Sequence, residues 1–303
     1  MNIKEISINL KKEQRELRIR NFLSNYSLII GSVVILFMIL VAVFAPFIIK
    51  QDPYEMVVAN RLMAPSREHI MGTDEFGRDL FARVVYGSRV SVFIGLVVAL
   101  ISSVFGLIIG LYASYYKILD NILMRICDGL IAIPGILLAI ALMAALGASS
   151  NNVIIALTIV YIPSVARIVR SSALVVKEQT FIKAAYAQGA SHFRILWGDI
   201  APNILSPLIV QATFIFASAI LSEAALSFLG AGIPDPEASW GNILQASKLV
   251  ISKAWWMAAF PGLMLIVSVL SLNLFGDGLR DFLDPRLKSI PRKNRKKGGV
   301  KNG

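Results

Sequence analysis

Long runs without charge alternate along this chain of 303 residues with short, strongly charged segments. Residues 21–49 carry no charged side chain, and their apolar part begins near residue 28. A helix rises about 1.5 Å per residue, so a stretch of this length crosses the roughly 30 Å hydrocarbon core of a bilayer. The pattern predicts a first transmembrane helix over 28–49. Pro46 follows the nearest small residues and disfavours signal cleavage there, so we expect this helix to be retained.

The later apolar runs predict five more spans. The second covers 90–112, the fifth 205–229 and the sixth 255–275. Residues 129–166 carry no charge for 38 positions, which is too long for one crossing. A turn-type cluster, GASSNN at 147–152, divides this run into a third and a fourth span. The predicted fold class is all-α: a polytopic membrane protein with six transmembrane helices.

Composition agrees with this architecture and excludes several others. Apolar residues make up 56% of the chain, and only 16% are charged, against about a quarter in soluble domains. The single cysteine, Cys127, cannot form an internal disulfide. The two histidines, His69 and His192, lie too far apart in sequence to suggest a metal cluster. The net charge of +11 comes from basic residues at the ends of apolar runs, so we expect no nucleic-acid partner.

The distribution of Lys and Arg predicts the orientation. With six spans, 22 of the 30 basic residues lie on the side of both termini and 8 on the other. The positive-inside rule then places the basic N-terminus (1–27), the 178–202 segment and the basic tail (281–303) in the cytoplasm. It places 50–89 outside, between the first helix and a core domain over 90–280.

The polar segment 181–206 interrupts the apolar pattern in a distinctive way. Ala184 and Ala185 come first, Gly189 follows four residues after Ala185, and Ile200 precedes Pro202 by two residues. Glycine permits a tight bend, and proline suits the start of a following helix. We therefore predict two short helices joined at a bend on the membrane surface, shaped to dock on another molecule.

This segment resembles the "EAA" coupling loop of bacterial ABC importer permeases, which inserts into a groove on a cytoplasmic ATPase. Lys183 stands where the motif often has Glu, and Ala201 where it often has Leu. By this resemblance, six residues would belong to the ATPase-coupling loop: Lys183, Ala184, Ala185, Gly189, Ile200 and Pro202.

Three further blocks narrow the resemblance to the dipeptide, oligopeptide and nickel permeases, and to their "C"-type subunit. They are HIMGTDEFGRDLFARVVYGSRVSV at 69–92, ILSEAALSFLGAGIPDPEASWGNIL at 220–244 and FPGLMLIVSVLSLNLFGDGLRDFLDPRLK at 260–288. The resemblance implies the type I importer permease fold in the bacterial inner membrane. It also implies a sister permease subunit in a heterodimer, two cytoplasmic ATPases and an extracytoplasmic binding protein.

The charged residues of two blocks have structural and functional interpretations. Asp74 and Arg78 are four apart and could form an exposed pair worth only a few tenths of a kcal/mol. Together with Asp79 they would brace the external segment or contact the binding protein. In the closing block, Asp277, Arg280 and Asp284 are expected to cap the last helix and pack against the coupling loop rather than act in catalysis.

Glu223 lies inside the fifth predicted span, where a carboxylate costs about 2.5–3.5 kcal/mol on insertion scales. It should therefore face the bundle interior or water. Two interpretations follow: a wall of the translocation path, or an interhelical hydrogen bond that positions the SFLG segment. The small neighbours on either side favour close helix contact.

The chain lacks a G-x-x-x-x-G-K-[ST] phosphate loop, a nucleophile elbow and an H-E-x-x-H motif. We therefore expect a permease subunit without enzymatic activity or cofactors of its own, with ATP and Mg²⁺ bound by partner subunits. Its cargo would be peptides or a related solute such as a nickel chelate. Two alternative functions are an ion-coupled secondary transporter and a membrane receptor or assembly subunit without transport. The first would need coupling carboxylates near the midplane, and the second would not need a coupling loop.

Overall fold

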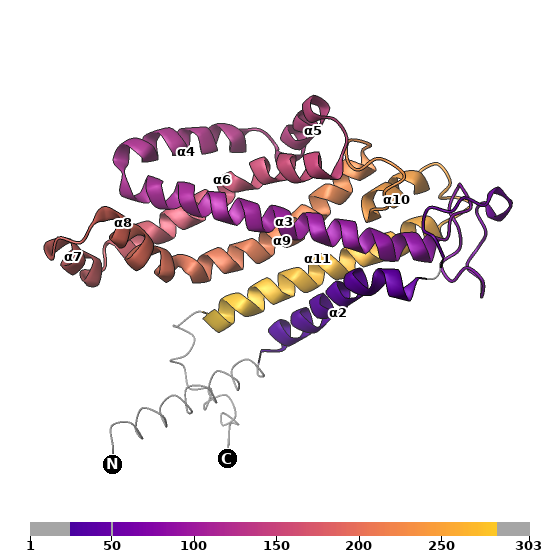
Figure 1. Ribbon diagram of the computed structural model, residues 1–303, viewed down its shortest axis with the longest axis horizontal. Coiled ribbons are helices and arrows are strands. Elements are labelled where there is room, and N and C mark those ends of the chain that lie inside the picture. The colour runs from indigo at the N-terminus through magenta and orange to yellow at the C-terminus, as the bar shows by residue number, and fades with distance from the viewer. Residues whose placement is uncertain (1–24, 50, 284–303) are drawn as a thin grey trace, which may run out of the picture.

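The computed structural model describes residues 25–49 and 51–283, and within these ranges its regular elements are helices (Figure 1). The long or apolar helices are α2 (Tyr26–Ile48), α3 (Leu80–Tyr115), α4 (Lys117–Ala132), α5 (Gly135–Leu146), α6 (Ser150–Lys177), α9 (Leu205–Phe228) and α11 (Trp256–Leu283). The shorter elements are η1 (Val58–Asn60), α7 (Thr180–Ala187), α8 (His192–Arg194), η2 (Ile195–Ile200), η3 (Ala201–Ile204) and α10 (Trp240–Ser247).

Five helical runs are long and apolar enough to cross a membrane, and the number rises to six when the bent pair α4–α5 is counted as one span. The six-helix prediction is confirmed, but the third span differs from the expected straight helix starting near residue 129. It begins at Lys117, in a stretch expected to be a loop, and bends by 93° between Ala132 and Gly135. Pro134 stands at this break, where its missing N–H prevents the helix from continuing.

α3 begins ten residues before the predicted start at residue 90. Asp79 caps it, because the Asp79 side chain accepts a hydrogen bond from the Ala82 backbone N–H at 2.8 Å. The helix then runs for 36 residues, or about 54 Å, so it extends beyond the hydrocarbon core. Part of the segment predicted as external loop, 50–89, is therefore the first turns of α3.

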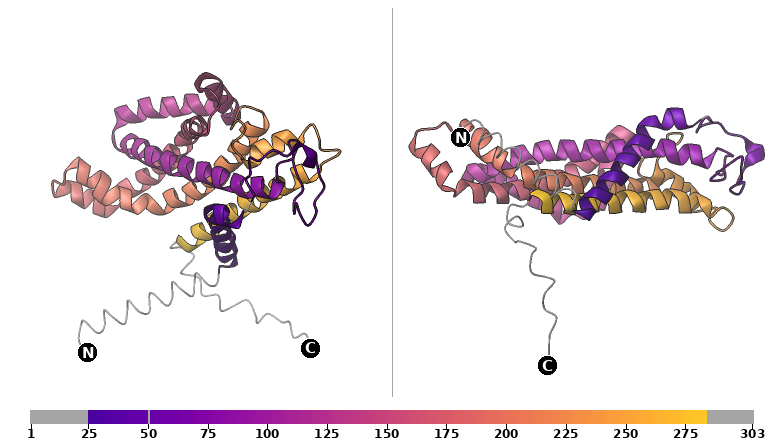
Figure 2. Two further views of the ribbon diagram at one scale, coloured as in Figure 1. Left: turned by 45° about the vertical axis from the view of Figure 1, so that its right-hand side comes forward. Right: turned by 90° about the horizontal axis from the view of Figure 1, so that it is seen from below.

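The core of the bundle is the crossing of α3 with α6, to which α9 packs closely. Gly106 of α3 lies at this crossing, where an added Cβ would come within 2.4 Å of the Val165 Cβ on α6. Small residues let transmembrane helices approach to van der Waals contact, which is a main source of their association energy. α2 lies on the outside of the bundle against α11 (Figure 2).

The two ends of the bundle carry different structures. α7 and α8 form one end, whereas the 51–79 segment and α10 form the other (Figures 1 and 2). The described chain ends meet on the α7 side, where the Asn25 side-chain amide donates to the Gly278 carbonyl at 3.1 Å. Both described ends therefore lie toward the same side of the bundle as α7, as six spans require.

Candidate functional site

The coupling segment, which we define as residues 178–202, has the predicted shape of two short helices joined at a bend. α7 ends at Ala187, and Gly189 adopts φ +74°. The Gly189 N–H bonds to the Tyr186 carbonyl and the Ala190 N–H to the Ala185 carbonyl, both at 3.0 Å. This pair of bonds is the Schellman motif, which places a left-handed residue, usually glycine, just past a helix end.

After the bend the chain re-enters a helix that leads directly into α9. The Ser191 hydroxyl accepts from the Arg194 N–H at 3.4 Å and starts α8. Pro202 stands in the first turn of η3, as the sequence predicted for the start of a helix. The helical run from His192 to Phe228 spans 37 residues, so the segment is mechanically continuous with a transmembrane helix.

One face of the coupling segment is anchored and the other is open. Ile182, Ile195 and Ile200 are each 0% exposed and belong to the hydrophobic core. On the open face, Lys183, Ala184, Gly189 and Pro202 are exposed, and Ala185 is half-buried. Lys183 pairs with Glu178 at 3.0 Å on this surface. Large apolar side chains are exposed here too, namely Phe181, Tyr186 and Phe193. Exposed aromatic rings on a rigid segment are typical of a protein contact surface.

Glu223 of α9 is fully buried and holds two hydroxyl groups. Its Oε2 accepts from Ser91 of α3 and its Oε1 from Ser227 of its own helix, each at 2.9 Å. The Ser227 hydroxyl in turn accepts from the Ile233 N–H at 3.1 Å, which fixes the loop after α9. Of the two interpretations from the sequence, this geometry is that of the interhelical contact that positions the SFLG segment.

The charged residues of the first block form a buried cluster in the outer cap, which we define as residues 51–79 with α10. Arg78 Nε donates to Asp74 Oδ2 at 2.6 Å, and the two side chains are 1% and 2% exposed. The pair is confirmed, but the expectation that it is exposed is wrong. Arg78 also reaches Asp235, at 3.4 Å, in the loop before α10. Tertiary contact with a loop 157 residues away buries this pair, which spacing alone does not reveal.

The third charged residue of this block, Asp79, lies beside the Asp74–Arg78 pair. Its Oδ2 is 2.9 Å from His69 Nδ1, so it joins the loop to the start of α3. Arg83 lies next to the cluster, with its Nη2 3.2 Å from Asp235 and its Nη1 buried without a hydrogen-bond partner in the described chain. Burial raises the pKa of neighbouring Glu75, whose Oε2 is likewise unpartnered among the described residues.

In the closing block, Asp277 and Arg280 are exposed on the last turns of α11, and Asp284 lies outside the described residues. Gly276 packs against Thr213 of α9 and Gly278 against Leu28 of α2. The described part of the block, up to residue 283, is therefore a continuation of the last helix that packs on α2 and α9.

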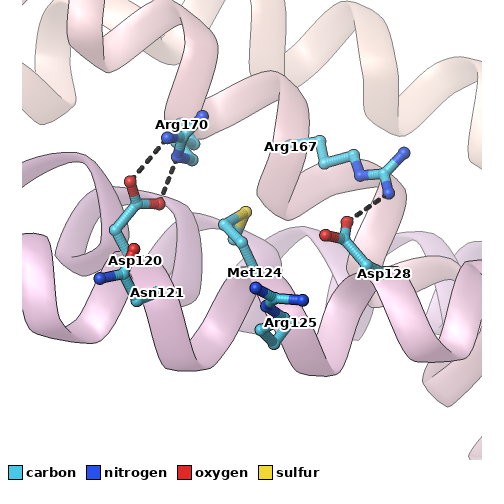
Figure 3. A pocket seen from close by; sticks show the side chains of 7 residues that line it. All are labelled: Asp120, Asn121, Met124, Arg125, Asp128, Arg167 and Arg170. Atoms are coloured by element: carbon cyan, nitrogen blue, oxygen red, sulfur yellow. Dashed lines mark hydrogen bonds and ion pairs between the residues drawn. The ribbon is translucent and has the colours of Figure 1, made fainter.

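Sequence reasoning missed a polar groove between α4 and α6. The groove has a volume of about 520 Å³ and is lined by Asp120, Asn121, Met124, Arg125, Asp128, Arg167 and Arg170 (Figure 3). Arg170 binds Asp120 through both carboxylate oxygens, at 2.5 and 2.6 Å, and Arg167 binds Asp128 at 2.6 Å. The signal was present: the polar residues of 117–128 recur every three to four positions, as on one face of a helix.

Comparison with known proteins places the chain in a family. Residues 102–289 match the family described as binding-protein-dependent transport system inner membrane component. Residues 15–65 match the N-terminal transmembrane domain of oligopeptide transport permease C.

Relatives are similar over most of their length. A putative peptide transport system permease protein of Brucella abortus is 51% identical over 89% of this chain and 91% of its own. The dipeptide transport system permease protein DppC of Alkalihalophilus pseudofirmus is 46% identical over 86% of each chain. A probable D,D-dipeptide transport system permease protein of Escherichia coli is 42% identical over 84% of this chain and 86% of its own.

The fold also has a counterpart among solved structures. An inward-facing crystal form of the MetNI methionine ABC transporter aligns with a TM-score of 0.56. The alignment covers 67% of this chain and 97% of that one, at 19% identity, which supports the fold alone. With these matches and six apolar spans, the chain belongs to the inner-membrane permease components of binding-protein-dependent ABC importers, in the branch of the oligopeptide permease C subunits.

Proposed function

We propose that this chain forms half of the translocation path of an ATP-driven peptide importer and takes no part in ATP hydrolysis itself. The single observation that carries the proposal is the coupling segment at one end of the bundle, opposite the outer cap, with one face anchored in the core and the other exposed. Peptides are the proposed cargo because relatives of 42–51% identity are named for peptide, dipeptide or D,D-dipeptide transport.

The coupling segment would be the docking site for a cytoplasmic ATPase. Its exposed aromatic rings and small residues fit a protein groove, and its buried isoleucines join it firmly to the core. ATP-driven closure of two ATPases would displace this segment, and its continuity with α9 would transmit the movement into the membrane. The ATPases supply the differential binding energy that any such switch requires. ATP and Mg²⁺ would be held by those partners.

The outer cap would face the extracytoplasmic binding protein. This orientation follows from the charge bias, with 22 basic residues on the side of the termini and coupling segment. A second permease subunit would complete the path, because the polar groove between α4 and α6 is open in the single chain and five charged side chains line it. Charged groups at such positions face water or protein rather than lipid.

The experiment is isolation of the affinity-tagged chain from its native membranes in mild detergent. We expect a second permease, two ATP-hydrolysing polypeptides and peptide-stimulated hydrolysis when the binding protein is added. A stable chain that purifies without any ATP-hydrolysing partner would contradict the proposal. Reconstituted vesicles with ATP at the coupling-segment face should import labelled dipeptide, and vesicles containing a non-hydrolysable ATP analogue should not.

A further inference from the structure

Four aromatic side chains gather where the coupling segment meets the end of α3. We call Tyr115, Tyr116, Tyr186 and His192 the aromatic clamp. The Tyr115 ring lies 6.1 Å from the Tyr186 ring in a stacked arrangement and 5.4 Å from the His192 ring in an edge-on one. The Tyr116 ring lies 6.4 Å from His192. The clamp therefore contacts both sides of the Gly189 bend, because Tyr186 precedes it and His192 follows it.

A hydrogen bond gives the clamp a fixed geometry. The Tyr115 hydroxyl bonds to His192 Nδ1 across 77 positions of sequence. Lys177, the last residue of α6, donates to the Ser114 carbonyl at 3.1 Å, and its ammonium lies 5.2 Å from the centre of the Tyr115 ring. Aromatic stacking and cation–π contact add to the hydrogen bond. The end of α3 is thus tied to the coupling segment by the Tyr115–His192 bond and to the end of α6 by Lys177.

The clamp stands at the corner from which α4 starts. Tyr116 is both the C-cap of α3 and the N-cap of α4, whose first turn carries Asp120. The carboxylate of Asp120 receives both hydrogen bonds of the Arg170 guanidinium, and this pair forms one wall of the polar groove (Figure 3). A continuous series of contacts therefore runs from the coupling segment through the clamp and the α3–α4 corner to the groove.

The chain itself links the coupling segment to α6 and α9, but not to α4. Hydrophobic anchors such as Ile182 and Ile195 hold the segment to the core through apolar contacts, which are non-directional. A hydrogen bond between two ring systems is directional. We propose that the aromatic clamp is a positioning device that makes the α3–α4 corner move together with the coupling segment, so that ATP-driven displacement reaches the polar groove. This inference rests on the proposed function.

The test compares ATP hydrolysed per peptide imported in vesicles containing the complete complex. Tyr115→Phe keeps the ring but removes the hydroxyl, and His192→Ala removes its partner. Tyr115→Phe should raise the ratio about fivefold, the effect of one ordinary hydrogen bond, and His192→Ala at least as much. The double variant should be no worse than His192→Ala alone, since the bond that Tyr115→Phe removes is already absent there. His192→Asn, which keeps a side-chain acceptor near the Nδ1 position, should restore most of the coupling.

The control is Phe105→Ala, which removes an exposed ring from the same helix away from the coupling segment. It should leave the ratio unchanged. The inference is overturned if Tyr115→Phe and His192→Ala import peptide at the wild-type ratio with both ATPases bound, or if their effects multiply in the double variant. Absence of ATPases from the unsubstituted complex would instead refute the proposed function.

Discussion

Ser91 of α3 donates its hydroxyl hydrogen to the carboxylate of Glu223 on α9, at 2.9 Å, in a part of the bundle where both side chains are 0% exposed. The same serine oxygen lies 3.4 Å from the Trp240 N–H at the start of α10. One buried carboxylate therefore organises two transmembrane helices and the entrance to the outer cap.

Glu223→Gln should keep assembly and most transport, because an amide can still bond to Ser91 and Ser227. Glu223→Leu should lower the amount of assembled complex, since it leaves two buried hydroxyls without their partner, at a cost of about 1–3 kcal/mol each in a dry site. The measurements are complex yield in detergent and dipeptide uptake. If Glu223→Gln abolishes uptake while the complex stays intact, the negative charge of Glu223 is itself required for transport.

Arg78 supports a second prediction, on the stability of the outer cap. Arg78→Leu removes the cation that pairs with the buried carboxylate of Asp74. Breaking a buried ion pair in this way typically lowers the free energy of unfolding by about 3–5 kcal/mol. We expect a clearly lower thermal unfolding midpoint of the purified complex. Arg67→Leu, which removes an exposed cation from the same segment, is the matched control and should shift the midpoint little. Equal midpoints for the two variants would contradict the buried role of Arg78.

The coupling segment could be predicted from sequence because its shape is local. A Gly one residue past the helix C-cap, a serine N-cap and Pro202 specify the bend and the restart within about 20 consecutive residues. The buried state of Arg78 could not be predicted, because it depends on Asp235, which the fold brings from the loop before α10.

The polar groove could not be predicted from sequence for a similar reason, although the amphipathic pattern of one of its walls could be recognised. The periodic polar face of 117–128 predicts an amphipathic helix, but its pairing with Arg167 and Arg170 requires the position of α6. The 93° bend likewise combines a local cause, Pro134, with a direction that packing of α5 on α6 and α9 determines. Local sequence therefore indicates where a helix breaks, whereas the direction of the chain after the break depends on tertiary contacts.

A third prediction concerns orientation. In a Cys127→Ser background, Met56→Cys in the outer cap should react with an impermeant thiol reagent added to intact cells. Ser191→Cys in the coupling segment should react only after the membrane is made permeable. Both positions are exposed in the structure, so burial does not explain a difference between them. Reaction of position 191 from outside intact cells would reverse the proposed orientation.

The last prediction tests the bend of the coupling segment. Gly189 has φ +74° and no atom within 4 Å of the position of an added Cβ, so a substitution acts through backbone strain rather than through a clash. A residue with a Cβ in this region pays roughly 1–2 kcal/mol, and a β-branched one adapts least well. Gly189→Val should therefore deform the bend while the transmembrane helices remain folded. Gly189→Ala should have a milder effect.

We expect Gly189→Val to insert and to pair with the proposed second permease subunit, but to retain less ATPase and to lose most peptide uptake. The control is Gly262→Val on α11, where an added Cβ also meets no atom within 4 Å but the backbone is helical. Because this control makes the same side-chain change without the left-handed strain, its uptake should stay near normal. The measurements are co-purification of the ATPases and peptide-stimulated hydrolysis in vesicles. Full uptake and full ATPase retention in Gly189→Val would show that the bend does not serve docking, and the assignment of 178–202 as the coupling segment would fail.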